Sequence, residues 1–187
     1  MAGVYISWPF CAQKCTYCNF ASGVEKPEIQ ARYLDALCAH LSRQEWPFVP
    51  ETVYFGGGTP SLLRPEELAR IVEEIPGALW REFTLEAAPG SLLPEQVAEW
   101  ARMGVNRVSL GVQSFAEKEL RQTGRRHLAR TVADDCGMLR DAGIENFNLD
   151  LIAGLPFQTS ESWEESLAWV ERLQPNHVSV YMLEVDE

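Results

Sequence analysis

The stretch VYISWPFCAQKCTYC, residues 4–18, joins a short apolar run to three closely spaced cysteines. Residues 4–8 are rich in β-branched and aromatic side chains, which is typical of a buried strand. Pro9 and the polar pair Gln13 and Lys14 disfavour one buried helix across the cysteines. The stretch therefore predicts a strand followed by a loop that carries the thiols.

The three cysteines, Cys11, Cys15 and Cys18, have the spacing Cys-x3-Cys-x2-Cys. This spacing is also that of a stripe of small residues on a helix, which is one alternative. A zinc site is a second alternative, but structural zinc takes four ligands and Phe20 stands where a near fourth cysteine would sit. Three thiolates suit an iron–sulfur cubane with one open iron, which the pattern favours.

The rest of the chain repeats a short β-rich run followed by an amphipathic helix. The predicted strands are residues 4–8, 52–55, 82–86, 107–110, 146–152 and 177–182. The predicted helices are residues 27–44, 65–75, 94–103, 131–142 and 161–173, with a short extra helix within 113–130. This alternation predicts an α/β fold with a parallel sheet and right-handed crossovers. Six units are too few for an eight-unit barrel, so an open partial barrel and a flat doubly wound sheet both remain.

Helix-end signals support these boundaries. Gly104 is expected to cap the helix before it, and Thr159 with Ser160 to open the last one. Cys38 and Cys136 lie on apolar helix faces and are expected to be buried thiols.

Polar groups follow the carboxyl end of each predicted strand, where parallel α/β folds place their sites. They comprise the cysteine loop, residues 56–61 (GGGTPS), Glu86, Gln113, Asp150 and Glu184. Each could be an ordinary turn or a strand-end cap, but their convergence on one rim favours a site.

Composition narrows the functional class. The net charge of −11 over 187 residues argues against a nucleic-acid partner, because phosphate binding needs clustered lysine and arginine. No signal peptide and no apolar run of membrane-spanning length is present. We therefore expect a cytoplasmic protein whose cysteines meet a reducing environment and bind metal rather than form disulfides.

Five motifs together resemble the radical S-adenosylmethionine (SAM) superfamily, and within it the oxygen-independent coproporphyrinogen III oxidase family. They are residues 5–11 (YISWPFC), 55–61 (FGGGTPS), 111–115 (GVQSF), 124–127 (GRRH) and 148–159 (NLDLIAGLPFQT). The resemblance covers almost the whole chain and implies a partial (β/α)6 TIM-like barrel of the radical SAM type. It implies a [4Fe–4S] cluster on Cys11, Cys15 and Cys18 and SAM on its open iron.

The resemblance also implies residue roles. Those expected to contact SAM or flank the cluster are Tyr5, Tyr17, Gly57, Gly58, Thr59, Glu86, Gln113, Arg125 and Asp150. Arg125 would suit the SAM carboxylate, and Glu86 an ammonium or ribose hydroxyls. Ser7, Trp8 and Ala88 depart from the family pattern, which puts local contacts in doubt.

Phe20 separates two branches of that family. The oxidase branch has a further cysteine there, whereas the HemW-like branch of heme chaperones has phenylalanine. The resemblance therefore implies heme or porphyrin as a partner, together with an electron donor for the cluster. The alternatives are a porphyrinogen-decarboxylating oxidase and another radical SAM oxidoreductase. The family is about twice as long, so residues 1–187 are expected to form its core domain without the C-terminal domain.

Overall fold

The computed structural model describes residues 2–183 of the chain. Six strands form a single sheet whose order follows the sequence, and every neighbouring pair is parallel. The strands are β1 (Gly3–Trp8), β2 (Thr52–Gly57), β3 (Glu82–Ala87), β4 (Arg107–Gln113), β5 (Asn146–Ala153) and β6 (His177–Met182).

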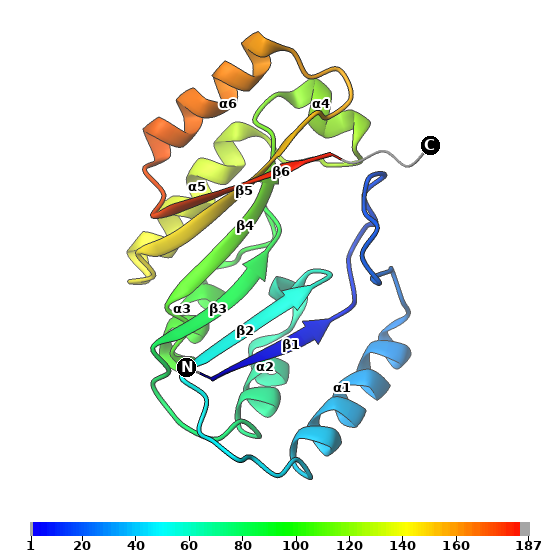
Figure 1. Cartoon of the computed structure of the whole chain (residues 1–187), viewed down its shortest axis with the longest axis vertical. Coiled ribbons are helices and arrows are strands. Elements are labelled where there is room, and N and C mark those ends of the chain that lie inside the picture. Colours follow the sequence, from blue (N-terminus) through cyan, green and yellow to red (C-terminus); the bar gives the residue numbers. More distant parts are fainter. Residues whose placement is uncertain (1, 184–187) are drawn as a thin grey trace.

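Helices connect the strands along one face of the sheet (Figure 1). They are α1 (Pro27–Leu41), α2 (Pro65–Val72), α3 (Pro94–Met103), α4 (Glu117–Gln122), α5 (Ala129–Asp141) and α6 (Ser160–Leu173), with a short 3-10 turn η1 (Pro60–Leu62). Proline opens α1, α2 and α3, where its missing N–H costs nothing. Gly104 ends α3 in the left-handed conformation, and the Thr159 hydroxyl accepts from the Ser162 amide at the start of α6, as the sequence predicts.

The strand order decides between the two architectures left open by the sequence pattern. A doubly wound sheet reverses its strand order at a switch point, whereas here each crossover advances by one strand. Figure 1 shows the resulting sheet curved, with its helices on the outer side and β1 and β6 at opposite edges. The fold is an unclosed partial barrel, which confirms the expected (β/α)6 class.

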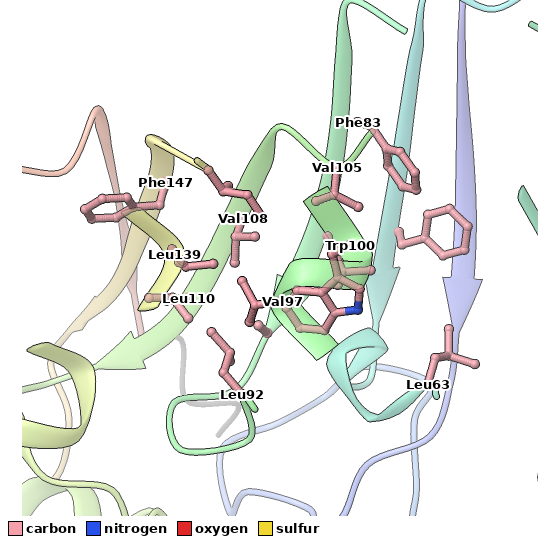
Figure 2. Packing of buried hydrophobic residues seen from close by; sticks show 14 of the residues in the cluster. Leu63, Phe83, Leu92, Val97, Trp100, Val105, Val108, Leu110, Leu139 and Phe147 are labelled. Carbon is pink, nitrogen blue, oxygen red and sulfur yellow. The ribbon is translucent and has the colours of Figure 1, made fainter. Parts of the chain in front are cut away.

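The two faces of the sheet differ in polarity. Outward side chains such as Phe55, Phe83 and Phe147 are fully buried beneath the helices. Figure 2 shows Trp100 and Val97 of α3 among the side chains that pack against this face. Inward side chains alternate with them and are polar, which leaves the concave face free to bind a ligand.

A few details differ from the sequence expectation. Helix α1 ends at Leu41 and α2 at Val72, each about one turn early, while α5 begins at Ala129. Cys136 is buried as expected, but Cys38 is only half-buried, because it lies at the outer seam between α1 and α2 with its thiol near the Arg70 carbonyl. Glu184 lies outside the described residues. No helix within residues 2–183 has the length and apolarity that crossing a membrane requires.

Candidate functional site

The cysteine loop is closed by backbone hydrogen bonds at its base. The Cys11 amide donates to the Gly23 carbonyl at 2.9 Å, and the Gly23 amide donates to the Pro9 carbonyl at 2.9 Å. Cys11, Cys15 and Cys18 are all half-buried free thiols within this loop. The loop thus brings three thiols to the carboxyl end of β1.

The glycine loop after β2 is bonded to the start of the cysteine loop. The Gly58 amide donates to the Trp8 carbonyl at 2.7 Å, and the Thr59 amide donates to the Phe10 carbonyl at 2.8 Å. A Cβ added at Gly58 would lie 2.5 Å from the Phe10 carbonyl oxygen and 2.8 Å from its backbone nitrogen. Only glycine fits this close approach of two backbones.

The turn after α4 holds the other side of the cysteine loop. The Thr16 amide donates to the Thr123 carbonyl at 3.3 Å, and the Gln13 side-chain amide donates to the Gly124 carbonyl. Arg125 follows this turn and donates to the Tyr17 hydroxyl at 3.1 Å and to the Gly111 carbonyl at 2.8 Å. The structure therefore brings Tyr17 and Arg125 together beside the thiols.

Burial shapes the charges at this contact. Desolvation raises the pKa of the Tyr17 phenol, so it stays protonated at neutral pH. Desolvation lowers the pKa of the Arg125 guanidinium. Electrostatic and hydrogen-bond interactions with Tyr17 and Cys15 outweigh this effect, so the pKa is raised overall. The rim thus holds a half-buried cation next to the cysteine loop.

Glu86 lies at the inner face of β3 opposite the glycine loop. One carboxylate oxygen accepts from the Tyr54 hydroxyl at 2.8 Å and the other from the Gly57 amide at 3.0 Å. Burial raises the pKa of this carboxyl, the two hydrogen bonds lower it, and Asp150 raises it further. Tyr5 stacks on Tyr54 with ring centroids 5.6 Å apart, which places a second phenol beside the same acid.

Asp150 and Gln113 occupy the neighbouring strands. Asp150 accepts from the Ser109 hydroxyl at 3.0 Å and from the Asn148 side-chain amide at 2.6 Å. Gln113 ends β4 beyond a register shift in its pairing with β5 and has a φ of 69°, which is rare for a residue with a side chain. Asp150 therefore shares the inner face with Glu86, while Gln113 marks an irregular strand end at the rim.

The thiols fit an iron–sulfur cluster by donor type and by placement on one closed loop. Among the described residues, however, no group of three or more His, Cys, Asp and Glu side chains is arranged to hold a metal ion. A cluster on this loop would require the three sulfur atoms to move together.

Three residues of this site were not predicted from the sequence: Tyr54, Ser109 and Asn148. Each lies on the inner face, and each bonds directly to an expected site residue. The alternation of side chains along a strand could have indicated Tyr54 and Asn148, because residues two apart face the same side of the sheet. Tyr54 lies two residues before Gly56, and Asn148 lies two residues before Asp150.

The family model of the Radical SAM superfamily matches residues 5–170 of the chain. The chain is 36% identical to the heme chaperone HemW of Synechocystis over 190 residues, covering 96% of this chain and 46% of the relative. It is 35% identical to HemW of Escherichia coli, covering 98% of this chain and 50% of the relative. The chain thus spans about half the length of these curated relatives.

Solved structures agree with this match. Coproporphyrinogen III oxidase (HemN) of Escherichia coli superposes with a TM-score of 0.89 at 28% identity, covering 98% of this chain and 44% of that one. Methylornithine synthase (PylB) shares the fold, with a TM-score of 0.68 at 12% identity, covering 100% of this chain and 54% of that one. The family model covers most of the chain, and the overall fold agrees with both solved structures. The chain belongs to the Radical SAM superfamily.

Proposed function

We propose that this chain is the core of a HemW-like protein that binds a [4Fe–4S] cluster and SAM and takes part in heme binding and transfer in the cytoplasm. One observation carries the proposal: the loop with three free thiols is bonded on one side to the glycine loop and on the other to the turn that bears Arg125. The thiols, the Arg125 guanidinium and the inner-face acids thereby share one rim.

Cys11, Cys15 and Cys18 would hold three irons of the cluster as thiolates. When bound, the cluster supplies one electron for the reductive cleavage of SAM. The protein's own part is positional. The backbone hydrogen bonds from Gly58 and Thr59 hold the start of the cysteine loop against the glycine loop. The hydrogen bond from Thr16 to Thr123 holds the middle of the cysteine loop against the turn after α4.

The rim residues suit the polar end of SAM. Arg125 uses only some of its five donors on Tyr17 and Gly111, so others remain for a carboxylate. Each oxygen of Glu86 accepts one described hydrogen bond and keeps a lone pair for an ammonium or hydroxyl donor. Gly57 and Thr59 bring backbone close to the ligand, and Tyr5 and Gln113 flank it.

Heme handling is favoured over porphyrinogen oxidation by two findings. Several curated relatives at about 35% identity carry the name HemW, whereas the matching solved oxidase is 28% identical. Phe20 occupies the position of the oxidase branch's further cysteine and exposes 72% of its surface. The proposed partners are SAM, heme and an electron donor.

Anaerobic reconstitution tests the proposal. The chain is loaded with iron and sulfide, reduced with dithionite, and given SAM with either hemin or coproporphyrinogen III. We expect SAM binding and a hemin-dependent Soret band, with coproporphyrinogen unchanged. Consumption of coproporphyrinogen with release of 5′-deoxyadenosine would assign the oxidase activity instead, and a chain that binds neither SAM nor hemin would overturn the proposal.

A further inference from the structure

A hydrogen-bonded network spans the inner face from β4 to β6, and Asn148 lies at its centre. The Asn148 side-chain nitrogen donates to Asp150 at 2.6 Å and to the Ser109 hydroxyl oxygen at 2.7 Å. Its side-chain oxygen lies 2.6 Å from Nδ1 of His177 and accepts from the Ser179 hydroxyl at 3.2 Å. One buried amide therefore joins three strands.

The direction of each bond follows from the chemistry of the groups. An ionised Asp150 only accepts, so the nitrogen of Asn148 must face it and the oxygen must face β6. The Ser109 hydroxyl donates a hydrogen bond to the second oxygen of Asp150 and accepts one from Asn148. His177 must then carry a proton on Nδ1, because the amide oxygen cannot donate.

Both oxygens of Asp150 are fixed by this network. Ser109 on β4 holds one oxygen and Asn148 holds the other. Asn148 has an exposed fraction of only 1%, and Ser109 of 3%, while Asp150 is half-buried on the concave face. A carboxylate held at both oxygens cannot turn about its terminal bond, so its remaining lone pairs keep one direction.

We infer that Asn148 is a positioning residue for SAM binding, which acts by fixing the carboxylate of Asp150 and is itself oriented by His177 and Ser179 from β6. The inference rests on the proposed binding of SAM at the inner face. It extends the site beyond the rim loops to the edge strand, because β6 sets the orientation of the amide that holds Asp150.

A double-mutant cycle on the reconstituted chain tests this role. SAM dissociation constants are measured anaerobically for the unmutated chain, Asn148→Ala, Asp150→Ala and the double variant. We expect about a tenfold loss of affinity in Asp150→Ala and a several-fold loss in Asn148→Ala. The double variant should bind no more weakly than Asp150→Ala, because Asn148 acts only through that carboxylate.

Two further variants separate positioning from folding. Asn146→Ala removes the same residue type from the same strand and face, two residues before the asparagine that bonds Asp150, and should leave SAM affinity within about twofold. Ser109→Ala frees the other oxygen of Asp150 and should weaken SAM binding in the same non-additive way, even where Asn148→Ala folds poorly.

The results separate the positioning role of Asn148 from the binding of SAM by the chain. Additive losses in the cycle, or an Asp150→Ala chain with unchanged affinity, would overturn the positioning role while SAM binding stands. Failure of the unmutated reconstituted chain to bind SAM would overturn the proposed function itself and the inference with it.

Discussion

At the scale of single residues, the polar groups below the helices are as informative as those at the rim. Asp135 of α5 is 4% exposed and accepts from the Gly90 amide at 2.7 Å. Burial raises the pKa of this carboxyl to about 6, with Asp134 adding to the rise and the Gly90 bond opposing it. The hydrogen bond ties α5 to the loop after β3, and the buried charge opposes folding at neutral pH.

This pKa predicts how stability depends on pH. In the unfolded chain the carboxyl titrates near 4, so between about pH 4 and pH 6 the folded state binds more protons and stability falls as pH rises. Asp135→Asn keeps an oxygen for Gly90 without the charge, and should remove this fall. At pH 7 the variant should be more stable by about 1 kcal/mol, as denaturant unfolding at several pH values would measure.

Asp134→Asn is the matched control for that series. Asp134 is exposed on the same helix and pairs with Arg130 at 2.8 Å, so its removal should change stability little. A pH series in which Asp135→Asn keeps the slope of the unmutated chain would show that Asp135 is not the group responsible.

At the scale of elements, the close approach of Gly58 to Phe10 links the glycine loop to the cysteine loop. Gly58→Ala would force a Cβ against main-chain atoms that cannot move separately, so it should displace the cysteine loop. We expect a loss of about 2 kcal/mol in unfolding free energy and a marked loss of iron after reconstitution and desalting.

Gly137→Ala controls for the added methyl group. Gly137 lies within α5, and a Cβ there would meet nothing within 4 Å. Alanine is the better helix former, so this variant should be as stable as the unmutated chain or about 0.5–1 kcal/mol more stable, with iron retained. Equal iron retention in both variants would contradict the anchoring role of Gly58.

The elements were largely predictable from the sequence, and the contacts between them were not. All six strands were placed within a few residues, because β-branched and aromatic runs bounded by turns carry a strong local signal. The ends of α1 and α2 were missed, since a terminal turn depends on packing as much as on propensity. The strand–helix pattern left a partial barrel and a flat sheet open. The family resemblance implied the barrel, and the strand order, which the local pattern does not contain, confirms it.

In the candidate site, too, the positions of residues on strands were predictable, and the contacts between strands were not. Glu86 and Asp150 lie on the inner face as their strand positions predict, and Tyr17 meets Arg125 across 108 residues. Asn148 lies in a predicted strand and in a family motif, but no role was predicted for it, because its role depends on partners on β4 and β6. Long-range pairing of this kind has no local signature in a single sequence.

At the scale of the whole molecule, the open sheet leaves β6 as an exposed edge. Val180, Tyr181 and Met182 expose 52%, 57% and 77% of their surfaces. An apolar edge strand is a template for pairing with another chain, so the 187-residue chain should self-associate at raised concentration.

Val180→Lys should reduce this association, because a charged edge residue opposes strand pairing. Leu79→Lys is the control: Leu79 is 92% exposed in a loop away from the sheet edge, so the same gain of charge should change association little. Sedimentation velocity over a concentration series would measure both. Equal association of Val180→Lys and the unmutated chain would place the contact elsewhere on the surface.

Cys11, Cys15 and Cys18 are proposed to hold an iron–sulfur cluster with an iron open to SAM. The direct test is electron paramagnetic resonance of the anaerobically reconstituted, dithionite-reduced chain with and without SAM, in each of the five cysteine-to-alanine variants. We expect a [4Fe–4S] signal altered by SAM in the unmutated chain, Cys38→Ala and Cys136→Ala, and its loss in the other three. A cluster signal that survives in Cys11→Ala, or that requires Cys38 or Cys136, would contradict it.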